Sequence, residues 1–186
     1  SSNPSTSSSE TMKRFEIIYK GIPADGLIFS KNKFKHRTIF ADNWPNRARN
    51  WIPCKDHLSD KAGVDFVVTA PDHYQVVSNG IKVEETNLPG QFRLTHWRET
   101  VPLPTKIMVV GIADFAVDYP GETNGIPVSS WIFPEQKEKG FYDYAQALEI
   151  LRQEKDLGAH QSEHRQPVHA EVRAQGQQPL GEGRRA

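Results

Sequence analysis

The sequence has few of the features that mark several common classes of protein. Cys54 is the only cysteine among 186 residues, which excludes an intrachain disulfide and a multi-cysteine zinc site and leaves the compartment open. Its 23 basic and 23 acidic residues balance, so no net charge favours nucleic acid or an anionic membrane as a partner. No apolar run reaches the roughly 18 residues that a membrane span needs. The first eleven residues lack the basic and apolar regions of a signal peptide, and residues 1–14 are predicted to be a disordered tail or a cloning remnant.

From Phe15 onward, short β segments alternate with turn residues, a spacing that is typical of all-β sandwiches and barrels. We expect strands at Phe15–Tyr19, Leu27–Ser30, Val64–Ala70 and Tyr74–Ser78. A chain of this length can form one domain with a substantial core. The sequence therefore predicts a mostly β fold, an antiparallel β sandwich with one C-terminal helix, whose β domain covers residues 15–140.

Three later features extend this pattern. Asn79-Gly80 is the preferred pair for a tight hairpin turn with positive φ, so Ile81–Glu85 is expected to return antiparallel to the strand before it. Gln91–Glu99 alternates with period two, which predicts a strand with one wet face. Ile107–Val117 is the most apolar stretch, and its β-branched residues favour a central strand.

The C-terminal part changes character twice. Apolar residues recur three and four apart in residues 141–155, which predicts an amphipathic linker helix packed on the sheet. After Leu151 the last 35 residues contain no aromatic residue and no isoleucine, but six glutamines and three histidines. Such a composition cannot build a core, so residues 156–186 are predicted to be a low-complexity tail. A natural flexible tail and the product of a shifted reading frame both fit, and we favour the second.

One dense segment, Asn43–Gly80, points to a family. It contains, in order, Ala48-Arg49, Pro53-Cys54-Lys55-Asp56, Lys61-Ala62 and a strand from Tyr74 that reads Tyr-Gln-Val-Val-Ser-Asn-Gly. In this order and spacing, the motifs resemble the N-terminal domain of the gluzincin zinc aminopeptidases, the family that includes aminopeptidase N and the leukotriene hydrolase. The similarity covers about Phe15 to Leu151 and fades in the tail.

The resemblance implies a saddle-shaped β domain that caps a thermolysin-like catalytic domain. In the family, that catalytic domain carries a Gly-x-Met-Glu-Asn motif and a His-Glu-x-x-His zinc helix, which activate a metal-bound water. Neither motif occurs among these 186 residues. We therefore expect no catalytic zinc, no other cofactor and no peptide hydrolysis from this chain. We interpret it as a fragment truncated before the catalytic domain, which is its partner in the parent family.

The resemblance also implies which residues lie near substrate. In the family, a polar side chain five residues before the loop arginine reaches the amino terminus of the substrate, and the matching position here is Trp44. Tryptophan does not supply that acceptor. Asp42 and Asn43 are polar neighbours for a displaced role, so all three residues are candidates for a position beside the substrate.

The charged residues of the same loop have two interpretations. Arg47 and Arg49 have the guanidinium fork that clamps carboxylates or phosphates, but we favour ion pairs with Asp42, Asp56 or Asp60 that fix the loop. Cys54 would be a nucleophile only if a neighbouring base or a helix terminus lowered its pKa, and we favour a structural cysteine. His36, His73 and His96 are isolated in the sequence, and we expect surface or packed histidines rather than ligands.

A metal motif appears only in the tail. His160, Glu163 and His164 form a His-x-x-Glu-His pattern, and His169 and Glu171 follow as further ligand candidates. On a helix both imidazoles would share one face and bind zinc, with Glu163 as the base. Gly158 and Pro167 flank the motif and oppose such a helix. The pattern supports the alternative function, a free-standing promiscuous hydrolase of activated esters or phosphoesters.

A third role is binding rather than catalysis. If the first strands of a β domain are missing, strand edges are exposed, and these offer a route to self-association or to a partner strand. The sequence leaves open whether the chain is an enzyme on its own.

Overall fold

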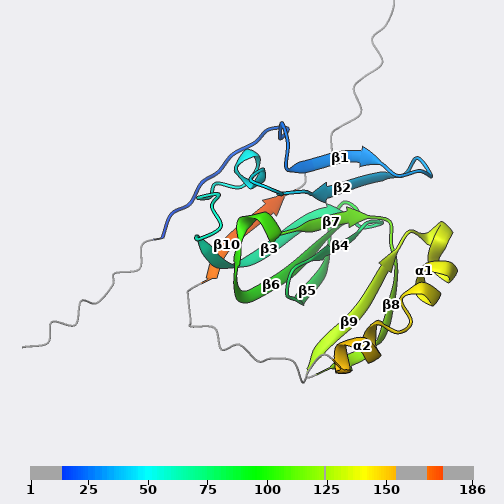
Figure 1. Ribbon diagram of the computed structural model, residues 1–186. Helices are drawn as coiled ribbons and strands as arrows, with labels where there is room; N and C mark the ends of the chain where they lie inside the picture. Colours follow the sequence, from blue (N-terminus) through cyan, green and yellow to red (C-terminus); the bar gives the residue numbers. More distant parts are fainter. Residues whose placement is uncertain (1–13, 124, 154–166, 174–186) are drawn as a thin grey trace, which may run out of the picture.

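The computed structural model describes residues 14–123, 125–153 and 167–173, and Figure 1 shows that β-strands dominate the fold. The strands are β1 (Leu27–Lys31), β2 (Arg37–Ala41), β3 (Lys61–Pro71), β4 (Gln75–Ser78), β5 (Ile81–Leu88), β6 (Phe92–Pro104), β7 (Val110–Ala113), β8 (Ala116–Thr123), β9 (Ile126–Ile132) and β10 (Pro167–Arg173). The helical elements are η1 (Ala48–Asn50), η2 (Thr105–Ile107), η3 (Pro134–Gln136), α1 (Lys137–Asp143) and α2 (Ala147–Gln153). The mostly β fold predicted from the sequence is confirmed. No helix in the described ranges has the length and apolar character that crossing a membrane requires.

The strands form two four-stranded sheets and a separate pair. The first sheet has the order β1-β2-β7-β4, the second has the order β10-β3-β6-β5, and β8 pairs with β9. The pairs are antiparallel, as expected, except that β10 runs parallel to β3. The β3–β6 ladder is the longest, and it shifts register between Ala62 and Val64.

The core lies between the two large sheets, because one set of buried apolar side chains comes from both. Ile39, Val76, Val110 and Ile112 come from the first sheet, and Val64, Phe66, Val68, Ala70 and Trp97 come from the second. The core residues of β3 recur with the period of two of a strand, although Asp65 between them is buried as well. A polar bond also joins the sheets, because Trp97 Nε1 donates to the backbone oxygen of Val76 at 3.0 Å.

The turn at Asn79-Gly80 does not close the predicted hairpin. β4 pairs with β7, whereas β5 pairs with β6, so the chain crosses from one sheet to the other at this turn. Gly80 does have the expected positive φ, +80°. Asn79 fixes the crossing with its amide: Nδ2 donates to the oxygen of Ile107 at 3.1 Å, and Oδ1 accepts from the backbone nitrogen of Val109 at 2.7 Å. The prediction that β5 returns along β4 is therefore wrong.

The apolar stretch Ile107–Val117 is divided among three elements. Ile107 ends η2, β7 follows at Val110–Ala113, and β8 begins only at Ala116. β7 is central, as predicted, because it lies between β2 and β4 and all four of its residues are buried. The exposed Asp114 follows β7 directly, and aspartate is disfavoured in strands, which explains why the central strand is shorter than expected.

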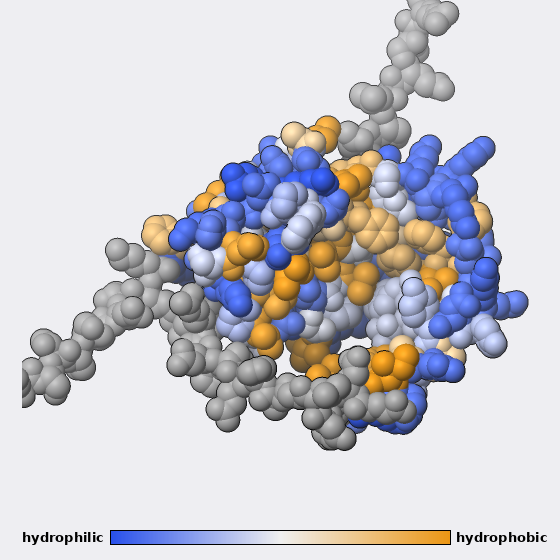
Figure 2. Space-filling view, viewed as in Figure 1, coloured by the Kyte–Doolittle hydropathy of each residue, from blue (hydrophilic) through white to orange (hydrophobic). Residues whose placement is uncertain are grey.

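The helical region after η3 consists of two short helices. α1 contacts β9, and α2 contacts β8. Phe141 and Leu148 of the predicted apolar stripe are half-buried, but Tyr144, Ala145 and Leu151 are exposed, so the predicted packing is wrong for these three residues. The helix breaks between Asp143 and Ala147, so the stripe does not lie on one continuous helix. Figure 2 shows a hydrophobic patch at the surface where Figure 1 places α2.

Two further expectations meet different outcomes. The expected strand at Phe15–Tyr19 lies in no sheet of the described part of the chain. Within the tail, Pro167–Arg173 forms β10 along the outer edge of β3, in a register that places His169 opposite Asp65. Residues 154–166 and 174–186 lie outside the described residues, and with them the candidate metal ligands His160, Glu163 and His164.

Candidate functional site

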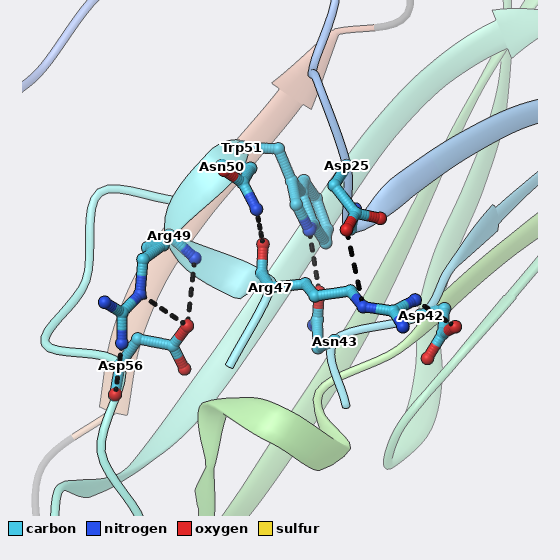
Figure 3. Close-up of polar contacts among 9 residues, drawn as sticks. Asp25, Asp42, Asn43, Arg47, Arg49, Asn50, Trp51 and Asp56 are labelled. Carbon is cyan, nitrogen blue, oxygen red and sulfur yellow. Dashed lines mark hydrogen bonds and ion pairs between the residues drawn. The ribbon is translucent and has the colours of Figure 1, made fainter. Parts of the chain in front are cut away.

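The loop from Asp42 to Asp56 contains the residues expected near substrate and those expected to be structural, and its polar contacts are shown in Figure 3. It leaves β2, turns through η1 and returns toward β3. Arg47 donates from Nη1 to Asp42 Oδ2 at 2.7 Å, and its Nε lies 3.4 Å from Asp25 Oδ2. Two carboxylates thus share one guanidinium. These contacts join the start of the loop to the turn before β1.

Arg49 makes a second set of contacts at the other end of the loop. Its Nε lies 3.3 Å from Asp56 Oδ2, and its Nη2 donates to the backbone oxygen of Asp56 at 3.2 Å. The backbone nitrogen of Arg49 also donates to Asp56 Oδ2. Both arginines therefore lie in ion pairs inside the loop, and their structural role remains a prediction that substitution can test.

Asn43 lies at the centre of the loop's attachment to the domain. It is 1% exposed, and its Nδ2 donates to the backbone oxygens of Thr105 and Met108. Its Oδ1 accepts from Trp51 Nε1 at 2.8 Å, and the Trp51 ring stacks on Phe66 of β3 with 6.1 Å between centroids. The Asn43 amide thus links the loop, η2 and the core, and its polar atoms point away from solvent.

Asp56 has an ionised side chain that the fold stabilises. Burial of the carboxyl raises its pKa, but hydrogen bonds from the Thr105 hydroxyl and from Arg49, together with the Arg49 charge, outweigh burial and hold the pKa below its ordinary value. The side chain is only 3% exposed, and Thr105 Oγ1 donates to Asp56 Oδ1 at 2.6 Å. Asp56 therefore binds fewer protons in the folded state than in the unfolded state near its pKa.

This linkage gives a testable dependence of stability on pH. Folding lowers the pKa of Asp56. The contribution of its carboxylate to the free energy of unfolding is therefore complete above the unfolded pKa of about 3.9, and it is lost as the pH falls through the folded pKa. We expect Asp56→Asn to lower the free energy of unfolding by about 2 kcal/mol at pH 7 and by less near pH 3. Urea unfolding at several pH values measures both. Asp60→Asn, a change of an exposed acid between the loop and β3, is the control, and an equal loss in the two variants at every pH would contradict this role of Asp56.

Cys54 lies in surroundings that keep it protonated. Burial raises the pKa of its thiol, and the charges of Asp56 and Asp60 add to this rise, whereas Arg49 opposes it. A thiol with a raised pKa is a poor nucleophile at neutral pH. The neighbouring Tyr19 has a phenol whose pKa is also raised by burial and by Cys54, and its hydroxyl donates to the backbone oxygen of Trp51. The local chemistry favours packing over catalysis.

The outer surface of the loop presents an aromatic ring and charges. Trp44 is 59% exposed, and Lys106 Nζ lies 4.4 Å above the centroid of its ring, in cation–π geometry. Asp42 is also half-exposed while it pairs with Arg47. Of the three residues expected near substrate, Trp44 and Asp42 are accessible from solvent and Asn43 is not.

A second polar cluster lies on the second sheet, and the sequence alone did not indicate it. Asp65 of β3 is buried, and its Oδ1 is 2.6 Å from His96 Nε2 and 2.7 Å from Arg98 Nε. The antiparallel register of β3 and β6 pairs Asp65 with Arg98, which brings residues more than thirty positions apart together. The cluster could be predicted from the sequence only if the register of β3 and β6 were known.

The described part of the chain also has an apolar cavity of about 350 Å³ between the first sheet and the β8–β9 pair. Phe115 is at its centre: its ring packs edge-on against Phe40 and Trp131 and stacks on Phe133. Gln136 is the one polar residue among those that line it. The cavity is open to solvent and lacks the convergent polar groups that orient a reacting substrate.

The described residues do not fit a metal. In residues 14–123 and 125–152, no three histidine, cysteine, aspartate or glutamate side chains lie close enough together to hold a metal ion. The isolated histidines have other contacts: His36 lies 3.0 Å from Glu135, and the His73 ring lies against Tyr74. No step of zinc chemistry can therefore be assigned to these residues.

The described residues thus form a β-rich domain in which Arg47 and Arg49 pair with aspartates at the two ends of the Asp42–Asp56 loop. The sequence model of the Peptidase M1 N-terminal domain matches residues 2–107, which is more than half of the chain, and the chain belongs to this family. Human glutamyl aminopeptidase is 25% identical over 114 residues, which cover 61% of this chain and 12% of that protein. Mouse glutamyl aminopeptidase is 24% identical over 141 residues, covering 73% of this chain and 15% of its own length.

Human endoplasmic reticulum aminopeptidase 2 is similar as well, with 25% identity over 107 residues, 58% of this chain and 11% of that protein. The chain thus spans about an eighth of the length of the curated relatives that it matches. The predicted relationship to the family's N-terminal domain is confirmed. The finer likeness to aminopeptidase N or to the leukotriene hydrolase stays a prediction.

Proposed function

We propose that this chain serves as the non-catalytic N-terminal domain of a zinc metallo-aminopeptidase and covers the substrate cleft of a catalytic domain. The family match supports the domain identity. The observation that supports the cap role is the network of polar contacts within and around the Asp42–Asp56 loop (Figure 3). Its arginine pairs and the buried Asn43 hold it rigid, while Trp44 and Asp42 remain exposed on its outer side. A loop that is rigid inside and exposed outside is suited to shape a partner's cleft.

In this proposal the catalytic domain is the partner, and zinc belongs to that domain alone. When bound there, zinc would supply the activated water for peptide hydrolysis. The residues of this chain would instead bound the cleft near the amino terminus of the substrate. Trp44, held over Lys106, would present an apolar wall where other members of the family are proposed to present a polar acceptor.

A loop graft into a relative tests this role. We expect that replacing the corresponding loop of a glutamyl aminopeptidase by Asp42–Asp56 lowers kcat/KM about tenfold to a hundredfold, because one hydrogen bond to the charged amino terminus of the substrate is lost. In the grafted enzyme, Trp44→Gln is expected to recover most of the loss, since it restores an acceptor. Steady-state kinetics with aminoacyl anilides measure the loss and the recovery of kcat/KM. The zinc content of each enzyme shows whether the catalytic metal is retained.

The matched control in the graft is Lys55→Gln, which changes an exposed residue of the same loop. Equal kcat/KM for the parent and the graft, or a loss that Trp44→Gln does not reverse, would contradict the placement of Trp44 beside the substrate. The rival hydrolase function has its own test. Stoichiometric zinc in the purified chain, lost together with turnover in His160→Ala/His164→Ala, would establish that function instead.

A further inference from the structure

The segment from Arg14 to Ile22 is the most exposed apolar stretch among the described residues outside the helices. Phe15 and Ile22 are 82% and 80% exposed, and Ile18 is 90% exposed. Figure 1 shows the segment running along the outside of the domain ahead of β1, and Figure 2 shows hydrophobic atoms at the surface along this margin. Such a concentration of large apolar side chains at a surface marks an interaction site.

The segment has the sequence of a strand without the neighbour that a strand needs. Its Phe-Glu-Ile-Ile-Tyr run consists largely of β-favouring residues. No backbone hydrogen bond joins residues 14–22 to any other part of the chain that the structure describes. One side-chain bond, from the Tyr19 hydroxyl to the backbone oxygen of Trp51, anchors it to the domain. The segment therefore offers free backbone donors and acceptors beside apolar side chains.

Its charges indicate which strand would pair with it. Glu16 and Lys20 have opposite signs and lie two residues on either side of Ile18. In an antiparallel pair of two identical segments centred on Ile18, each Glu16 faces a Lys20 of the other copy, and each Ile17 faces a Tyr19. Opposite charges and aromatic–β-branched pairs are the favourable cross-strand combinations. The segment is thus complementary to itself in one register.

Other pairings of two copies are less favourable. Centring the antiparallel pair on Ile17 would bring Arg14 opposite Lys20, two charges of the same sign. A parallel pair in register would bring Glu16 opposite Glu16 and Lys20 opposite Lys20. A two-fold axis at Ile18 avoids both conflicts, and it is the symmetry that closes a dimer.

We propose that this segment is a self-recognition strand, through which two copies of the chain associate by antiparallel pairing about Ile18. The Tyr19 anchor holds one end of the strand at the domain surface while Ile18 stays accessible. The contact is small, so the association is weak and depends on concentration. It is distinct from the cap role, since it does not use Trp44, and the Asp42–Asp56 loop contributes only the Trp51 oxygen that anchors Tyr19.

Sedimentation equilibrium of the full chain at low ionic strength tests the proposal. The weight-average mass is expected to rise from 21.1 kDa toward twice that value as the concentration increases from about 10 µM to about 1 mM. Ile18→Lys places two like charges at the axis and is expected to weaken association at least tenfold. Tyr142→Lys, an equally exposed aromatic residue on α1, is the matched control and is expected to leave association unchanged.

Charge exchange tests the direction of pairing. Lys20→Glu alone places a second carboxylate opposite Glu16 and is expected to weaken the dimer, whereas Glu16→Lys/Lys20→Glu restores opposite pairs and recovers it. The difference should shrink in high salt, because exposed charges are screened. Circular dichroism of each variant confirms that the fold is kept. A chain that stays monomeric throughout, or a dimer that survives Ile18→Lys unchanged, overturns the proposal.

Discussion

Gly80→Ala is expected to destabilise the domain by about 3 kcal/mol or more, one of the largest effects of any single methyl group added to this chain. Gly80 has φ +80°, a conformation that residues with a Cβ rarely adopt. A Cβ built there would also lie 1.9 Å from the backbone oxygen of Arg98 in β6. Because that atom belongs to the backbone of a paired strand, no side chain can move aside to relieve the contact.

Gly90→Ala is the matched control for this substitution. Gly90 has the same φ of +80°, but the nearest atoms to its built Cβ are in the Phe92 ring at 3.7 Å, an ordinary contact. We expect a loss of about 1 kcal/mol there, from the backbone conformation alone. Urea unfolding of the two variants separates the cost of the conformation from the cost of the close approach. Equal losses of stability in the two variants would show that the close approach of Gly80 to β6 adds no cost when a Cβ is introduced.

The same turn shows where sequence reasoning reaches its limit. The positive φ of Gly80 follows from local preference, and the sequence predicted it correctly. The partner of β5 does not follow from local preference, because Asn79 uses its amide to hold the Ile107–Val109 turn and sends the chain to the other sheet. Local turn preferences determine the backbone conformation of Gly80, whereas tertiary contacts determine which strand pairs with β5.

β-rich composition between turn residues identified most strands, and alternation with period two identified the strand that corresponds to β6. Thr95 and Trp97 of β6 are buried between less buried neighbours, a pattern that is visible without knowledge of the partner strand. The Phe15–Tyr19 segment has an equally clear β composition, yet pairing requires an available edge, and it lies in no sheet of the described residues. Composition measures the tendency to pair, and it does not reveal whether an edge is present.

The candidate site was predictable to the extent that its contacts are local. Arg47 reaches Asp42 five residues away, and Arg49 reaches Asp56 seven residues away, so pairing within the loop was a natural expectation. The Asp65 cluster needs the register of two strands, and the cavity around Phe115 needs the packing of the β8–β9 pair on the first sheet. Neither is encoded in a short window of sequence. The burial of Asn43 belongs to the same class, because Thr105 and Met108, two of its three partners, lie more than sixty residues away.

Asn43→Leu is expected to lower the free energy of unfolding by about 3 kcal/mol and to loosen the Asp42–Asp56 loop. Leucine has the same branching as asparagine but a larger side chain, and the substitution removes an amide that donates to the oxygens of Thr105 and Met108 and accepts from Trp51 Nε1. The Thr105 oxygen keeps a hydrogen bond from the backbone nitrogen of Met108, whereas the Met108 oxygen and Trp51 Nε1 lose the partner that Asn43 supplies. Each buried group left unsatisfied costs about 1 to 3 kcal/mol, and structural relaxation offsets part of this cost.

The natural control is Asn50→Leu, an exposed asparagine in the same loop whose amide makes one bond, to the backbone oxygen of Arg47 at 3.0 Å. We expect a loss below about 1 kcal/mol for that variant. Chemical denaturation measures both stabilities, and limited proteolysis reports whether the loop opens, since cleavage follows the population of the open form. If Asn43→Leu were as stable as Asn50→Leu, the loop would be held by its arginine pairs alone. A large and specific loss would instead identify one buried amide as the connection between the exposed Trp44 surface and the core of the domain.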